Sequence, residues 1–297
     1  MKEIDSTLKV GSFLRGDTYL IIRFISSDRI GCTYEAEHVF LEKRVAIKEF
    51  FPKDFCYRDE ATSHVAVGRV DKKALVENLR SKFIEDVRSL CNLHHSGIMS
   101  VSDMFEENGT VYFVLAPMGS RSIEYIINQE GPLDEKRAVG YIIQVAEILK
   151  YIHFNNRLHG DINPAKIFLD DNDNVFIGPI RLRQAESFAE IIEEADLDPE
   201  APLPPISPYE SLELHTNSYS YYLAPSADMY SLGATLYKML TGVTPLDFYN
   251  RVAGDELKPL PSRISAGTRN AIAAAMNLNI KKRPQSMSEF LQLLEIH

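Results

Sequence analysis

Alternating apolar and polar residues dominate the first third of the chain. β-branched and aromatic residues gather in three stretches that predict strands, at 19–25, 31–40 and 43–50. A second strand pair flanks Asn108-Gly109, a dipeptide typical of a type I′ hairpin turn. Between these groups, apolar residues recur every three or four positions and predict a helix over 75–93: Leu79, Phe83, Val87 and Leu90.

Longer helical patterns dominate the chain after about residue 120. Helices are predicted over 136–154, 226–242 and 286–296, the last opening with the capping-box residues Ser286 and Glu289. The acidic, proline-bearing segment 183–210 is predicted to be a long surface loop. This order indicates an α+β fold with a β-rich lobe over 10–116, a mostly helical lobe over 117–297, and a cleft between them.

Composition and charge narrow the classes of protein that the chain can represent. The chain has 297 residues, 45% of them hydrophobic, and a net charge of −10, so nothing drives broad nucleic-acid binding. No apolar run reaches the roughly 20 residues that span a bilayer. Cys32, Cys56 and Cys91 lack zinc-site spacing, which favours reduced thiols and a cytoplasmic protein, with Cys91 in the core.

Several segments in a fixed order carry a family resemblance. RVAIKEFF contains the V-A-I-K strand motif of protein kinases, and HGDINPAKI falls where a kinase has its H-R-D-x-x-x-x-N loop. The hairpin around Asn108-Gly109, ADMYSLGATLYKMLTG and KKRPQSMSEFLQLL follow the same pattern. From about residue 10 to its end, the chain resembles bacterial serine/threonine kinases of the eukaryotic-like type. The resemblance implies a bilobal, kinase-like fold.

The resemblance also implies where a nucleotide would bind. Lys48 is the V-A-I-K lysine, and Asp86 takes the place of its usual helix glutamate, one methylene shorter. Gly31, Ala116 and Met118 fall at the remaining nucleotide-binding positions.

The loop that should be glycine-rich departs from the kinase pattern. Ser26 and Asp28 replace its first two glycines. A carboxylate about 5 Å from a phosphate would be repelled by roughly 3 kcal/mol per unit charge at an effective dielectric constant near 20. The sequence therefore predicts a loop that holds ATP poorly.

The catalytic positions are substituted more heavily. Asp161 matches the kinase base, but Asn163 replaces the loop lysine and Lys166 replaces the magnesium-binding asparagine. Gly178 replaces the metal-binding aspartate of D-F-G, and Gly160 replaces the arginine that reads a phosphorylated activation segment. Lysine has no acceptor and glycine has no side chain, so we expect no protein ligand for a metal at either position.

In contrast, the positions that support the kinase fold still hold the residues of the kinase pattern. By resemblance, His159 and Asp228 brace the catalytic loop. Glu210 matches the glutamate that ends the activation segment, and Arg283 matches the buried arginine that pairs with it. These residues are expected to be structural and carry no argument for catalysis.

The substitutions together favour a pseudokinase: a regulatory, protein-binding domain with weak or no nucleotide binding. No cofactor is required, and ATP could bind without magnesium if Lys166 pairs with Asp161 and fills the metal site. The expected partner is a protein, such as another kinase or a signalling protein. The alternative is an atypical active serine/threonine kinase that uses Lys48 and Asp161. Adenylyl transfer on the same fold ranks last, because it also needs a metal site.

Overall fold

The chain folds as two compact units. The computed structural model describes residues 7–28, 30–116, 121–181, 207–215 and 225–295. Residues 7–94 and 99–116 form the first unit, and the other described residues form the second. Most of the predicted loop 183–210 lies outside the described residues, as does Met118.

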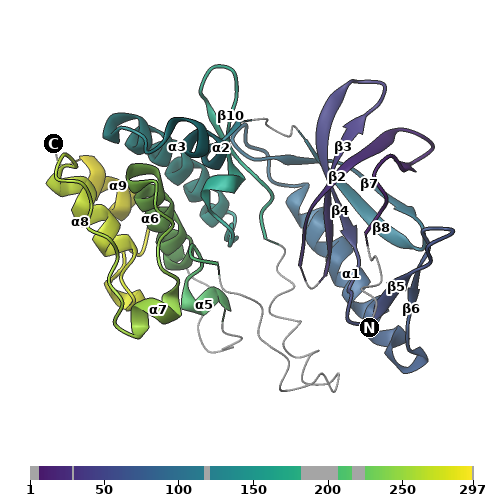
Figure 1. The fold of residues 1–297 in the computed structure, drawn as a ribbon. Coiled ribbons are helices and arrows are strands. Elements are labelled where there is room, and N and C mark those ends of the chain that lie inside the picture. Colours follow the sequence, from purple (N-terminus) through teal and green to yellow (C-terminus); the bar gives the residue numbers. More distant parts are fainter. Residues whose placement is uncertain (1–6, 29, 117–120, 182–206, 216–224, 296–297) are drawn as a thin grey trace. The chain divides into compact units, whose positions relative to one another are not determined.

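An antiparallel six-stranded sheet forms most of the first unit (Figure 1). Its order is β1-β2-β3-β4-β8-β7. The bounds are β1 Phe13–Leu14, β2 Tyr19–Ser27, β3 Gly31–His38, β4 Lys43–Phe50, β7 Ser100–Glu107 and β8 Thr110–Ala116. The predicted turn between β7 and β8 is confirmed, because Asn108 and Gly109 both have the positive φ, 50° and 71°, that a type I′ turn requires.

Helix α1 (Lys73–Leu90) follows a short 3₁₀ turn, η1 (Val70–Lys72), and packs on this sheet. The Phe83 ring lies 5.3 Å from Phe50 on β4 and 5.6 Å from Phe113 on β8, measured between ring centroids. The apolar face that predicted the helix is therefore the face that it buries. The prediction for Cys91 is wrong: it follows the last residue of α1 and is exposed.

A hairpin that the sequence pattern did not reveal lies between β4 and α1. Its strands are β5 (Cys56–Arg58) and β6 (Val65–Val67). The fully buried carboxylate of Glu49 anchors it, accepting a hydrogen bond from Arg58 Nη2 at 2.6 Å. The hydroxyls of Tyr34 and Tyr112 donate to the same carboxylate at 3.0 and 2.6 Å. A buried charge is tolerated where it is paired and hydrogen-bonded in this way.

The second unit is mostly helical. Side-chain caps begin most of its described helices: Ser122, Asp134, Asp247, Ser265 and Ser286 each accept a hydrogen bond from the backbone N–H three residues later. The helices among its described residues are α2 Ile123–Glu130, α3 Glu135–Phe154, α5 Leu212–His215, α6 Pro225–Thr241, α7 Phe248–Val252, α8 Ala266–Ala275 and α9 Met287–Glu295. Short 3₁₀ helices are η2 (Pro164–Lys166) and η3 (Ile280–Lys282).

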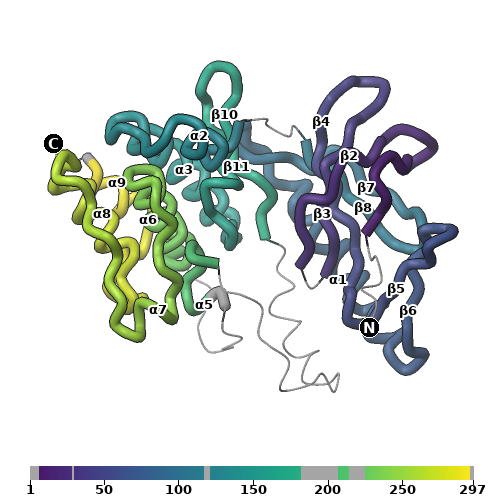
Figure 2. The backbone as a smooth tube through the Cα atoms, in the orientation of Figure 1, coloured from purple at the N-terminus to yellow at the C-terminus, as the bar shows by residue number. Residues whose placement is uncertain are grey.

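The core of the second unit surrounds α6. Nearly every side chain of α6 is buried, and the helix packs against both α3 and α8. The small antiparallel sheet of this unit has the order β11-β10-β9, with β9 Arg121–Ser122, β10 Ile167–Leu169 and β11 Val175–Ile177. Figure 2 traces the chain from α3 through a loop into β10 and β11. That loop carries most of the substituted catalytic positions. Among the described residues, no helix is long and apolar enough to cross a membrane.

Candidate functional site

Strand β4 presents Lys48 and Glu49 on its two opposite sides. Successive side chains of a strand alternate in direction, so the buried Glu49 carboxylate and the Lys48 ammonium cannot share a side. Lys48 lies opposite Thr33 on β3 and Phe113 on β8, and its side chain is 15% exposed.

The ion pair of Lys48 is with Asp28, in the loop between β2 and β3. Its predicted partner was Asp86, which is buried on α1. The other carboxylate oxygen of Asp28, Oδ1, accepts hydrogen bonds from the backbone N–H groups of Ile30 and Gly31, both at 2.9 Å. Burial raises the pKa of Asp28, but Lys48 and these two amides outweigh it, so the net pKa lies below the usual value. The carboxylate that was expected to repel phosphate is thus already neutralised by the lysine expected to bind it.

Gly31 has a packing reason to be glycine. A Cβ atom there would lie 1.9 Å from the carbonyl oxygen of Glu49, so no other residue fits without moving β4. Ala116 ends β8, and its carbonyl accepts a hydrogen bond from Ser100 Oγ at 3.2 Å. Nucleotide contacts at Gly31, Ala116 and Asp86 remain predictions.

The catalytic loop of the second unit brings Asp161, Asn163 and Lys166 together. Asn163 Nδ2 donates to Asp161 Oδ1 at 2.8 Å. The ammonium of Lys166 lies 3.7 Å from Asp161 Oδ2, which is the pairing that the sequence predicts. The Asp161 side chain is 42% exposed, yet each of its oxygens has a polar neighbour.

Gly178 lies beside Lys166, directly after β11. Its N–H donates to the Lys166 carbonyl at 2.6 Å, and it brings no side chain to the loop. The two positions where the kinase pattern places metal ligands therefore hold a cation and a bare backbone. Within the described ranges, no cluster of three or more His, Cys, Asp or Glu side chains could hold a metal ion. Magnesium requires oxygen ligands, and the side chains at positions 166 and 178 offer none, so Lys166 and Gly178 do not fit a magnesium ion.

Asp228 on α6 supports the catalytic loop from a fully buried position. Its carboxylate accepts hydrogen bonds from the backbone N–H groups of His159 and Gly160, both at 2.8 Å, and contacts His153 Nε2 at 2.8 Å. Burial raises the pKa of Asp228. His153, His159 and the Gly160 amide lower this pKa by more than burial raises it, so the net pKa lies below the usual value. Asp228 therefore fixes the loop as a buried anion.

The imidazole of His159 completes this support. Its Nδ1 accepts from the Asp161 N–H at 3.2 Å, so Nε2 carries the proton and donates to the Gly178 carbonyl at 3.1 Å. Complete burial lowers the pKa of His159, mainly through desolvation of the charged form. A neutral ring thus links the Asp161 and Gly178 positions.

Arg181 lies over Gly160, the residue that replaces the kinase arginine. Gly160 has a positive φ of 72°, and a Cβ atom there would lie 3.1 Å from the Cβ of Arg181. The Arg181 guanidinium pairs with Glu210. Arg181, which follows β11, therefore lies against the catalytic-loop position where the kinase pattern has an arginine and this chain has Gly160.

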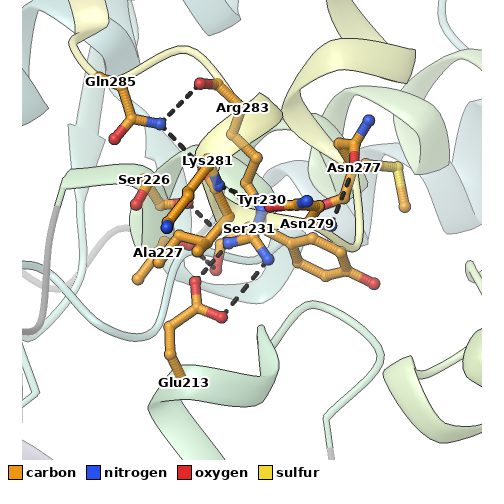
Figure 3. Close-up of polar contacts among 12 residues, drawn as sticks. Glu213, Ser226, Ala227, Tyr230, Ser231, Asn277, Asn279, Lys281, Arg283 and Gln285 are labelled. Carbon is orange, nitrogen blue, oxygen red and sulfur yellow. Dashed lines mark hydrogen bonds and ion pairs between the residues drawn. The ribbon is translucent and has the colours of Figure 1, made fainter. Parts of the chain in front are cut away.

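The predicted ion pair between Glu210 and Arg283 is wrong, because Arg283 pairs with Glu213 (Figure 3). The Arg283 guanidinium contacts both Glu213 oxygens and donates to the carbonyls of Ser226, at 3.0 Å, and Asn277, at 2.7 Å. It also stacks 5.1 Å from the centroid of the Tyr230 ring. The kinase pattern predicts a glutamate as the partner of Arg283, but it does not distinguish Glu210 from Glu213. Glu213 lies in the first turn of α5, whereas Glu210 precedes this helix.

Sequence reasoning missed three further residues with structural roles: His153, Arg181 and Glu213. His153 could have been found from its place at the end of the apolar face of α3, where a polar side chain must find a partner. No signal in the sequence pointed to Arg181 over Gly160.

Comparisons with known proteins identify the family. The protein kinase domain family model matches residues 54–294, a match that begins after Lys48. The chain belongs to the protein kinase domain family, and its fold is the protein kinase fold.

Curated relatives include serine/threonine-protein kinase PrkC of Bacillus subtilis, 26% identical over 77% of this chain and 31% of the relative. Another is an Aurora kinase of Yarrowia lipolytica, 27% identical over 78% of this chain and 62% of the relative. The chain thus matches less than two thirds of the length of either relative. A solved structure described as the PpkA-294 apo form covers 98% of this chain and is itself fully covered, with a TM-score of 0.73 and 22% identity.

Proposed function

We propose that this chain is a kinase-fold domain with impaired phosphoryl transfer, a pseudokinase that acts by binding protein partners. The observation that carries the proposal is the Lys166 ammonium, 3.7 Å from the Asp161 carboxylate. In the kinase pattern this residue is an asparagine that binds magnesium.

The chemistry of the donor set supports impairment. Phosphoryl transfer depends on positioning and on neutralising the phosphate charge with metal ions held by the protein. Lys166 offers three donors and no lone pair on its ammonium, and Gly178 offers no side chain, so neither position supplies a side-chain ligand for a cation. Loss of one preorganised electrostatic contact costs on the order of 10²–10³ in rate, and here two are replaced.

The side chains around Asp161 also support impaired phosphoryl transfer. A substrate hydroxyl that approached its carboxylate would compete with the Asn163 amide at Oδ1 and with the Lys166 ammonium near Oδ2. Asn163 also stands where the kinase pattern has a lysine that steadies the transferred group. The base position is therefore kept, but its oxygens are already engaged.

The supporting residues favour a binding role. Asp228 holds the catalytic loop through two backbone amides, and Arg283 holds Glu213, Ser226 and Asn277 together. A fold kept in this way while its chemical groups are replaced suits a module recognised by its surface. The partner proposed is a protein, such as another kinase or a signalling protein. ATP binding, where it occurs, is proposed to be weak and independent of magnesium.

Transfer of radiolabel from γ-labelled ATP tests the proposal. The purified chain is assayed for self-phosphorylation and for phosphorylation of a generic basic protein, with Asp161→Asn as the matched control. Equal, background-level incorporation by both proteins is expected. Robust incorporation by the natural chain that disappears in the variant would establish an active serine/threonine kinase and overturn the proposal.

A further inference from the structure

Three donors converge on the Asp28 carboxylate at the tip of the β2–β3 loop. Lys48 pairs with Oδ2, and the N–H groups of Ile30 and Gly31 donate to Oδ1. The loop is closed as well, since the Asp28 N–H donates to the Gly31 carbonyl at 3.0 Å. The carboxylate is thus bound by its own loop and by the neighbouring strand.

This donor set is chemically that of a phosphate site. An ammonium and adjacent backbone N–H groups recognise a phosphate group in the same way as they recognise a carboxylate, through charge-assisted hydrogen bonds. The backbone donors face inward to Asp28, so the loop satisfies its own donors before any ligand arrives.

We infer that Asp28 is a built-in competitor of phosphate-bearing ligands, which occupies Lys48 and the Ile30 and Gly31 amides with its own carboxylate. A polyphosphate or nucleotide reaches these donors only after Asp28 has moved away. The inference deepens the proposed function, on which its regulatory meaning rests, by giving a specific cause for weak nucleotide binding in the first unit.

The competition is reversible in principle, because the Asp28 side chain is 49% exposed and lies at a loop tip. A ligand that binds only the form with Asp28 displaced has its affinity reduced by the fraction of molecules in that form. Once displaced, the carboxylate stays near the ligand and repels it. Removing the charge of Asp28 weakens its hold on Lys48, which lowers the closed fraction, and ends the repulsion of the ligand.

The test compares Asp28→Asn with Asp54→Asn. The asparagine at position 28 keeps an oxygen for the Ile30 and Gly31 amides but gives up the charge. Asp54 is exposed in the same unit, so its variant changes the net charge equally. Each protein is titrated calorimetrically with sodium tripolyphosphate and, separately, with ATP, both in EDTA.

Asp28→Asn is expected to bind tripolyphosphate about tenfold more tightly than the natural chain, a factor set by the closed fraction. Asp54→Asn should stay within twofold of the natural chain. Tighter binding of tripolyphosphate and ATP together would assign the gain to the phosphates, whereas a gain for ATP alone would indicate a base or sugar contact and count against the inference.

A double variant tests whether the gain in affinity depends on Lys48. In Asp28→Asn combined with Lys48→Met, the gain should vanish, because the freed ammonium is missing. Equal affinities of Asp28→Asn and the natural chain, or a gain that survives loss of Lys48, would overturn the inference. Asp28→Ser, which also removes the charge but keeps a hydroxyl acceptor, provides the same comparison should the asparagine variant unfold.

This outcome is separable from that of the proposed function. The difference in binding between Asp28→Asn and the natural chain in EDTA reports on Asp28 and Lys48, whereas radiolabel transfer reports on Asp161. A chain that transfers phosphate could still show the Asp28 competition, and a chain without transfer could lack it.

Discussion

The Arg283 guanidinium contacts both carboxylate oxygens of Glu213 and is itself completely buried. Removing one member of a buried ion pair leaves an uncompensated charge, which costs about 3–5 kcal/mol. Glu213→Gln should therefore lower the free energy of unfolding by about that amount in urea titrations. Glu210→Gln is the matched control, because its pair with Arg181 is only partly buried, with the arginine side chain 40% and the glutamate side chain 14% exposed, and it should cost less than Glu213→Gln. A larger loss at Glu210 than at Glu213 would contradict the pairing.

The buried Glu49 carboxylate gives a second prediction, for the first unit. This carboxylate accepts hydrogen bonds from Arg58, Tyr34 and Tyr112. The side chains of Glu49 and Arg58, which form the ion pair, are both less than 5% exposed. Glu49→Gln keeps the shape but removes the charge, so we expect a loss of about 3–5 kcal/mol in the free energy of unfolding.

Glu37→Gln is the control for Glu49. Its pair with Arg44, at 3.8 Å, joins side chains that are 34% and 48% exposed, so its removal should cost no more than about 1 kcal/mol. Urea unfolding followed by circular dichroism measures both variants. Equal small losses would mean that the Glu49 network contributes little to stability.

His159 predicts how stability depends on pH. Its folded pKa is lowered by burial from an ordinary value of 6.5, so below pH 6.5 the unfolded chain binds more protons than the folded one. Stability is therefore complete above that pH and falls as the pH drops towards the folded pKa. Asp228, whose pKa is lowered from 3.8, adds a loss of the same sign at lower pH.

Calorimetric melting temperatures between pH 7.5 and 5 measure this dependence. His159→Gln should flatten the slope between pH 6.5 and 5. His64→Gln, at an exposed histidine of the first unit, should leave the slope unchanged. The same slope in both variants would refute the assignment to His159.

Much of the fold was predictable because local patterns determine it. The helix through Phe83 and the turn at Asn108-Gly109 follow from side-chain periodicity and backbone preference, which do not depend on distant residues. The β5–β6 hairpin was missed because its strands have three residues each and its anchor is a single buried carboxylate, Glu49.

The identities of the substituted catalytic residues were readable from the sequence, but most of their partners were not. Two glutamates three positions apart could each face Arg283, and only the start of α5 selects Glu213. The sequence leaves open whether the Asp28 carboxylate faces a phosphate or solvent, because it cannot show that the loop turns this carboxylate towards Lys48. The pairing of Lys166 with Asp161 was predictable, since both lie within one short loop.

Restoring the two ligand positions should restore metal dependence. A Cβ atom at Gly178 would lie 3.2 Å from Phe168, 3.3 Å from the Lys166 carbonyl oxygen and 3.4 Å from the Lys166 Cδ. The lysine side chain thus lies against position 178 and leaves position 166 without a metal ligand. Gly178→Asp alone should therefore give no magnesium-dependent ATP binding. Combined with Lys166→Asn, it should give a thermal shift with ATP that requires magnesium. A magnesium-dependent shift in the single variant would show that Lys166 does not block the site.

Thermal denaturation of the natural chain, titrated with ATP in magnesium and again in EDTA, tests the central claim most directly. Because Lys166 and Gly178 supply no side-chain ligand for a cation, any rise in melting temperature should be the same in both buffers. A rise that appears only with magnesium would contradict the account.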